Sequence, residues 1–184
     1  ELEPGAARIV ELLGRVQGRT AISYDPNVRM AKRGPVEAGR AAVERVVALA
    51  DVVKVSSEDL DWLYPGQDPV EAAARWTTAG PALVVVTLGG DGAVGLRAGG
   101  EQVRRPSPPV TVVDTVGAGD AFSSGLLGAL ADRGALAGAG AALSEVDLGP
   151  VLERAALVAA LTCARPGADP PTLAEVTAAE PDQS

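Results

Sequence analysis

The chain has 184 residues, 47% of them hydrophobic, which is enough for one domain with a substantial core. Its formal net charge of −8 argues against nucleic acid or an anionic membrane surface as a partner. It contains no histidine and a single cysteine, Cys163, which excludes an internal disulfide, zinc sites of the usual ligand types and histidine-dependent nucleophiles. No apolar run approaches the roughly 20 residues of a membrane span, and we expect a cytoplasmic protein.

Apolar helical stretches alternate with short β-branched runs, a pattern that indicates βαβ units. This predicts a three-layer, Rossmann-like α/β fold with a central, mostly parallel sheet. In chain order we expect a helix at 2–18, a strand at 20–24, a helix at 36–50, a strand at 52–55, a helix starting near 56, a helix at 69–79, a strand at 83–87, a hairpin of 93–97 and 102–105, a strand at 110–113, a helix at 118–133, a loop at 134–149, a helix at 151–164 and a frayed tail at 178–184.

The segment DTVGAGDAFSSG, from Asp114 to Gly125, leads the last expected strand into a helix through a glycine-rich turn. Glycines let the backbone approach a ligand closely, and a helix N-terminus binds anions through unpaired N–H groups. The N–H groups of 116–120 can therefore converge on an oxyanion, with Asp120 placed as a general base, as phosphoryl transfer to a hydroxyl requires. For GAGD alone, a helix cap that uses the Asp120 carboxylate is the simpler interpretation.

This segment resembles the C-terminal signature of the ribokinase/PfkB carbohydrate kinases, usually written DTxGAGDxFxxG. In that family the Asp of GAGD deprotonates the sugar hydroxyl, and the preceding backbone amides form an anion hole. The resemblance implies that Asp120 is the catalytic base and that Gly117, Ala118 and Gly119 form the hole. It also implies a ribokinase-like fold, a sugar substrate, and ATP with Mg²⁺.

Two further segments resemble the nucleotide-binding parts of the family. The expected strand 83–87 runs into LGGDG, which resembles the TxGxxG turn that lines the nucleotide; a tight turn without a ligand is the alternative. RPGADP, at 165–170, is similar to the RxGA loop that shapes the adenine pocket. The residues implied to bind nucleotide are Thr87, Gly89, Gly92, Ala156 and Gly167, with Ala156 standing where many members have Asn.

Two metal sites follow from the same resemblance. KVSSEDL, at 54–60, resembles the NxxE segment that helps organise magnesium, with Ser56 in place of Asn and Asp59 in place of Glu. Asp59 would hold the metal through a water, and a helix start with solvated acids is the alternative. Asp114 would help bind a monovalent cation such as K⁺. Pro171 stands where ribokinases place a Ser, so potassium dependence remains open.

YDPNVR, at 24–29, looks like the DPNxR element of fructokinase-like members. The resemblance implies that Asn27 and Arg29 bind the sugar together with Asp120, and it favours fructokinase, which converts D-fructose to fructose 6-phosphate. The alternative is an Asx-Pro turn beside a surface arginine. A homodimer of the full-length protein is a further expectation.

The resemblance spans 1–184 as one incomplete domain, which corresponds to the C-terminal portion of the family's domain. The N-terminal strands with their sugar contacts and the small β lid are missing, so we expect the chain alone to bind nucleotide weakly and to be a poor kinase. Two alternatives stay open. In the first, the protein is a kinase whose acceptor is 2-keto-3-deoxygluconate, ribose or a nucleoside. In the second, the chain is a non-catalytic nucleotide-binding fragment, which the departures at Ser56, Ala156 and Pro171 support.

Overall fold

The computed structural model describes residues 5–28, 34–137 and 141–180. Its helices and strands, in chain order, are α1 (Gly5–Val16), β1 (Ser23–Tyr24), α2 (Val36–Val47), β2 (Val52–Ser56), α3 (Ser57–Leu63), α4 (Pro69–Ala74), β3 (Leu83–Thr87), β4 (Ala93–Leu96), β5 (Gln102–Arg105), α5 (Ala118–Asp132), α6 (Leu148–Cys163) and α7 (Leu173–Ala179). Short 3₁₀ turns occupy Arg75–Thr78, Gly89–Asp91, Ala98–Gly100 and Ala141–Ser144.

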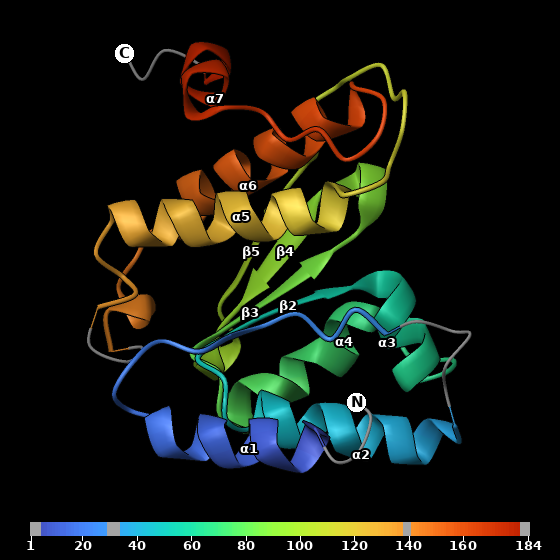
Figure 1. Cartoon of the computed structure of the whole chain (residues 1–184), viewed down its shortest axis with the longest axis vertical. Coiled ribbons are helices and arrows are strands. Elements are labelled where there is room, and N and C mark those ends of the chain that lie inside the picture. Colours follow the sequence, from blue (N-terminus) through green and yellow to red (C-terminus); the bar gives the residue numbers. More distant parts are fainter. Residues whose placement is uncertain (1–4, 29–33, 138–140, 181–184) are drawn as a thin grey trace.

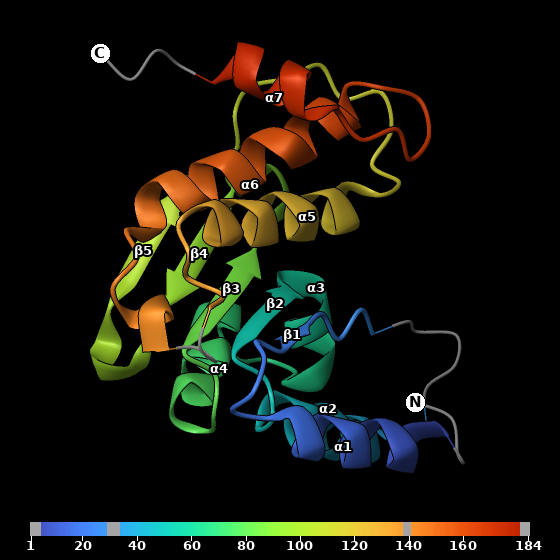
Figure 2. The same cartoon turned by 60° about the vertical axis from the view of Figure 1, so that its left-hand side comes forward.

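The five strands form one mixed sheet in the order β1-β2-β3-β4-β5. β1, β2 and β3 run parallel, with Val52 opposite Leu83, whereas β4 and β5 add as an antiparallel hairpin. Figure 2 shows the strands side by side in this order. The carboxyl ends of β1, β2 and β3 therefore meet at one edge of the sheet, which is where α/β proteins usually bind ligands.

Helices cover both faces of the sheet, which confirms the three-layer α/β fold (Figure 1). Alternate residues of the central strands point to opposite faces. Val53 and Val84 pack in the cluster that includes residues of α2, α3 and α4, whereas Val52 and Val85 pack with α5 and α6. None of the described helices is long and apolar enough to cross a membrane.

The strand expected at 110–113 is wrong. This segment lies outside the sheet, and Val112 and Val113 are more than half exposed. The N–H groups of Val113 and Asp114 instead donate to the Cys163 carbonyl oxygen at the end of α6, at 2.8 and 3.2 Å. Hydrogen bonds to a helix end thus replace the strand pairing that β-branched residues usually favour.

Several element boundaries also differ from the expected ones. β1 keeps only Ser23–Tyr24 of the strand expected at 20–24, and the helix expected at 69–79 continues after α4 as a 3₁₀ turn. Asp147 caps α6, whose first residues fall in the expected loop. The sequence reasoning missed α7, which includes the first two residues of the expected tail; 181–184, like 2–4 of the first expected helix, lie outside the described residues.

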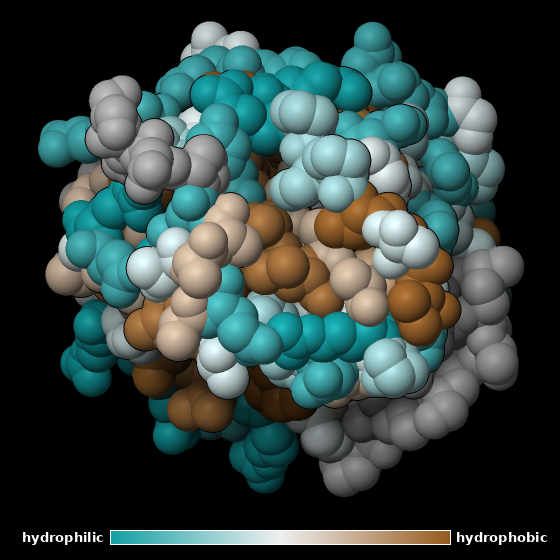
Figure 3. Space-filling model, turned by 90° about the horizontal axis from the view of Figure 1, so that it is seen from above, coloured by the Kyte–Doolittle hydropathy of each residue, from teal (hydrophilic) through white to brown (hydrophobic). Residues whose placement is uncertain are grey.

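The C-terminal face over α5, α6 and α7 carries exposed apolar side chains. Figure 3 looks down on this side and shows apolar residues gathered near the middle of the face, among hydrophilic ones. Three of the exposed large apolar residues precede or enter the α5 turn and one begins α7; they are Val112, Val113, Val116 and Leu173.

Gly92 provides a test of the sheet edge that carries the turn after β3. Its φ is +93°, and a Cβ there would lie 2.1 Å from the Arg105 carbonyl oxygen. We expect Gly92→Ala to lower the free energy of unfolding by about 2 kcal/mol or more, the scale of a strained backbone. Gly90→Ala is the matched control, because a Cβ at Gly90 meets no atom within 4 Å. Equal denaturation midpoints for the two variants would contradict the close contact and the strained backbone at Gly92.

Candidate active site

A cavity of about 580 Å³ lies between the carboxyl ends of β1–β3 and the N-terminal turn of α5. Its wall combines small residues with several carboxylates and one lysine. It brings together most of the residues that the sequence singled out: Asn27, Asp59, Thr87, Gly89, Gly92, Gly117, Ala118, Gly119, Asp120 and Ala156. Arg29 lies outside the described residues.

The turn before α5 depends on glycine at position 117. Gly117 is the N-cap of α5 and has a left-handed backbone with φ +81°. A Cβ on Gly117 would lie 2.8 Å from the Ala168 Cβ. The loop that resembles RxGA therefore packs directly on the glycine-rich turn, and a side chain at Gly117 would strain the backbone and separate the two loops.

The first turn of α5 presents N–H groups to the cavity. The Ala118 N–H donates to the Thr115 carbonyl oxygen at 3.2 Å and so belongs to the turn itself. Within the described chain, the N–H groups of Gly119 and Asp120 have no hydrogen-bond acceptor. Two free donors at the positive end of a helix of 15 residues are suited to an oxyanion.

The Asp120 carboxylate stands at the third position of the same helix. Asp120 is exposed and lines the cavity. A base must reach the hydroxyl that it deprotonates, and the Asp120 carboxylate and the free N–H groups belong to the same turn in the cavity wall. The arrangement can therefore bind an anion and accept a proton at neighbouring points.

Asp114, in the loop before α5, bonds to Gly167, in the loop after α6. The Asp114 carboxylate accepts hydrogen bonds from the N–H groups of Val116 and Gly167, each at 3.0 Å. These bonds hold the pKa of Asp114 below its ordinary value, and the bond from Val116 has the larger effect. The carboxylate is therefore charged at neutral pH. Neither Gly167 nor Asp114 is in the cavity wall. Burial, and then the Asp114 charge, raise the pKa of the neighbouring Cys163 thiol.

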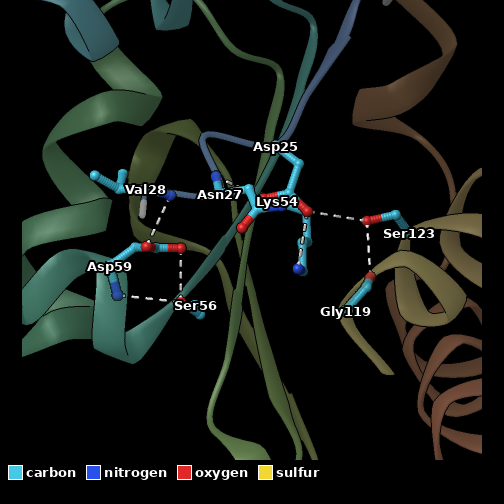
Figure 4. Close-up of polar contacts among 8 residues, drawn as sticks. All are labelled: Asp25, Asn27, Val28, Lys54, Ser56, Asp59, Gly119 and Ser123. Atoms are coloured by element: carbon cyan, nitrogen blue, oxygen red, sulfur yellow. Dashed lines mark hydrogen bonds and ion pairs between the residues drawn. The ribbon is translucent and has the colours of Figure 1, made fainter. Parts of the chain in front are cut away.

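Asp59 has a structural role beside the expected metal contact. Its carboxylate accepts the Val28 N–H at 2.9 Å and the Ser56 hydroxyl at 2.8 Å, while Ser56 caps α3 by accepting the Asp59 N–H. Figure 4 shows these bonds. No group of three or more metal-binding side chains occurs among the described residues.

Sequence reasoning missed an ion pair at the edge of the cavity. Lys54 on β2 donates from Nζ to Asp25 Oδ2 at 3.0 Å, and the Ser123 hydroxyl of α5 lies 3.4 Å from the same oxygen. Next to them, Asn27 has a φ of +37°, and its N–H donates to Asp25 Oδ1 in an Asx turn. The signal for the pair was a lysine inside an otherwise apolar central strand, because such a position is rarely charged unless it is paired.

Residues 10–175 match the family described as pfkB family carbohydrate kinase. The chain belongs to this family. It is 44% identical to a fructokinase of Rhizobium leguminosarum bv. trifolii over 119 residues, which cover 65% of the chain and 36% of that protein. It is 37% identical to the aminoimidazole riboside kinase of Salmonella typhimurium over 123 residues, covering 67% of the chain and 36% of that protein.

The solved structures agree with this membership and confirm the ribokinase-like architecture. A fructokinase double mutant from Vibrio cholerae, in a form bound to fructose, ADP and a potassium ion, matches with a TM-score of 0.76 and 30% identity. That match covers 96% of this PfkB chain and 56% of the V. cholerae chain. The chain thus spans between about a third and just over half the length of these kinases.

The Asp114 contacts predict a pH-dependent stability. The pKa of Asp114 is lower in the folded state than in the unfolded state. Its contribution to the free energy of unfolding is therefore complete above the unfolded-state pKa of about 3.9, and is lost as the pH falls below that value toward the folded-state pKa. We expect Asp114→Asn to lower Tm at pH 7, and the difference from the wild type to shrink in acid. The control is Asp91→Asn, at an exposed position of the Gly89–Asp91 turn. A Tm difference that stays constant from pH 7 to pH 3 would disprove the charged contact.

Proposed function

We propose that the protein transfers the terminal phosphoryl group of ATP to a sugar hydroxyl, with D-fructose as the acceptor and fructose 6-phosphate as the product. The observation that carries this proposal is the first turn of α5, where the Asp120 carboxylate and two free N–H groups face one cavity. Membership of the PfkB family and similarity to fructokinases support it. The sequence element DPNxR, which includes Asn27, supports fructose in particular.

In the proposed mechanism, Asp120 accepts the proton of the sugar hydroxyl as its oxygen attacks the terminal phosphorus of ATP. The bond from that phosphorus to the bridging oxygen breaks, and ADP leaves. Charge on the transferred group is stabilised by the N–H groups of Gly119 and Asp120, aided by the positive end of α5. The Gly117 N–H, which likewise has no acceptor within the described chain, would complete this anion hole, whereas the Ala118 N–H holds the turn in shape.

The nucleotide would lie along the remaining wall of the cavity. Thr87 and the Gly89–Gly92 turn would flank its phosphates and ribose, and Ala156 would bound the adenine. The loop around Gly167, which lies outside the described cavity wall, would complete the adenine pocket. Asp59 would hold a water of a magnesium ion, which would supply positive charge to the phosphates. Asp114 would contribute to a potassium site, consistent with its ionised carboxylate and with the potassium ion in the V. cholerae fructokinase structure.

A second acceptor class has an observation in its favour. The chain is 37% identical to an aminoimidazole riboside kinase, which is close enough to keep a riboside as the alternative acceptor. The same base and anion site would serve either substrate, because the chemistry at the hydroxyl is identical. A cytoplasmic location and a homodimer remain part of the proposal.

The acceptor is tested with a panel of sugars on the full-length gene product. With ATP and Mg²⁺, we expect kcat/KM to be highest for fructose among fructose, ribose, 2-keto-3-deoxygluconate and a nucleoside, and NMR to identify fructose 6-phosphate. A higher value for another acceptor would overturn the fructose assignment. Absence of transfer to every acceptor would overturn the kinase proposal and favour the non-catalytic alternative.

The base is tested by Asp120→Ala in the same protein. Loss of a positioned general base should lower kcat by about 10²- to 10⁴-fold, while the affinity for ATP changes little because the N–H donors remain. Glu37→Ala, at an exposed carboxylate in the first turn of α2, serves as the control and should keep wild-type kcat. Full activity of Asp120→Ala would rule out the mechanism.

A further inference from the structure

The buried ion pair of Lys54 and Asp25 lies beside the proposed anion site. The Lys54 side chain is 7% exposed, that of Asp25 is 25% exposed, and Nζ lies 3.0 Å from Oδ2. Figure 4 shows Lys54 between the segment that follows β1 and the first turn of α5. Nζ lies 3.1 Å from the point that a Cβ on Gly119 would occupy. The ammonium group is therefore packed against the backbone of the proposed anion hole.

This position is electrostatically unfavourable for a lysine. The N-terminus of α5 carries a partial positive charge, and the N–H groups of Gly119 and Asp120 add to it. A cation stabilises a helix at the C-terminus, not at the N-terminus. An anion between Nζ and these N–H groups would remove the repulsion and be stabilised by both.

Asp25 compensates for only part of the Lys54 charge. Its Oδ2 atom is shared with the Ser123 hydroxyl at 3.4 Å. Within the described chain, Asp25 is the one hydrogen-bond partner of Lys54, so two of the three ammonium N–H donors are available to a ligand. Since a buried ion pair gains little net stability after desolvation, fold stability alone is a weak reason for this lysine.

The charges of the cavity wall point to the same ligand. The described lining contains the carboxylates of Asp25, Glu58, Asp59 and Asp120, and Lys54 is its only basic residue. A polyphosphate would meet repulsion from these acids at every point except beside Lys54 and the α5 turn. The most negative part of the ligand is therefore expected there.

We propose that Lys54 donates a hydrogen bond to the phosphoryl group that is transferred, and that Asp25 positions its ammonium for this contact. The inference rests on the proposed function. Lys54 stays protonated and no bond to it forms or breaks; it offsets negative charge on the phosphoryl oxygens as the group moves from ADP to the acceptor. By this assignment Lys54 is a catalytic residue and Asp25 a positioning residue.

The contact is tested by comparing two nucleotides in the full-length gene product. In Lys54→Met, calorimetry should show the affinity for a non-hydrolysable ATP analogue reduced tenfold or more, with the ADP affinity within threefold of wild type. The kcat should fall by about 10²- to 10³-fold. Arg97→Met is the matched control, because it removes another side chain that is 7% exposed and paired with a carboxylate, that of Glu101, outside the cavity. It should leave both affinities unchanged.

Equal loss of both nucleotides, or no loss of either, would overturn the assignment of Lys54. Lys54→Gln repeats the comparison if the methionine variant does not fold. These binding measurements need no acceptor, so they give an answer even if the sugar panel fails.

Asp25→Asn tests the positioning role. It should lower kcat while the KM values for ATP and sugar change less than threefold, and the double variant Asp25→Asn/Lys54→Met should lose no more than Lys54→Met alone. Additive losses in kcat would show that Asp25 does not act through Lys54.

Discussion

The candidate site depends on the parallel pairing of β1, β2 and β3. This pairing brings the ends of the three strands to one edge of the sheet, so that Asp25, the Ser56–Asp59 segment and Thr87 surround one cavity although they are far apart in the sequence. α5 then closes the cavity from the opposite side. A one-residue shift in register would turn Lys54 to the other face of the sheet and remove it from the site.

The site combines a helix N-terminus with a buried lysine, which is an unfavourable pair unless an anion lies between them. The left-handed turn at Gly117 begins α5, whose first residues line the cavity and whose Gly119 and Asp120 N–H groups have no acceptor within the described chain, and the Ala168 loop packs against that turn. Lys54 approaches from β2, with Asp25 beside it. The Asp120 carboxylate, the Lys54 ammonium group and the first turn of α5 thus line the same cavity. The proposed phosphoryl transfer needs both this base and this positive charge.

The local parts of the site could be predicted from the sequence, whereas the long-range parts could not. The glycine-rich turn and Asp120 lie within one short segment whose chemistry is visible in its residues. Lys54 and Asp25 are 29 residues apart, and their contact depends on the pairing of β1 with β2. The strand expected at 110–113 failed because its N–H groups bond to the end of α6, which no local pattern reveals. α7 was predictable in principle, since Thr172 and Glu175 form a capping box.

The most direct test of this account is a crystal structure of the full-length protein with a non-hydrolysable ATP analogue, Mg²⁺ and fructose. The account predicts oxygens of the terminal phosphate within hydrogen-bond distance of the Gly119 and Asp120 N–H groups and of Lys54 Nζ. It also predicts a sugar hydroxyl beside the Asp120 carboxylate. A nucleotide whose terminal phosphate points away from the first turn of α5, or that binds outside the cavity, would contradict it.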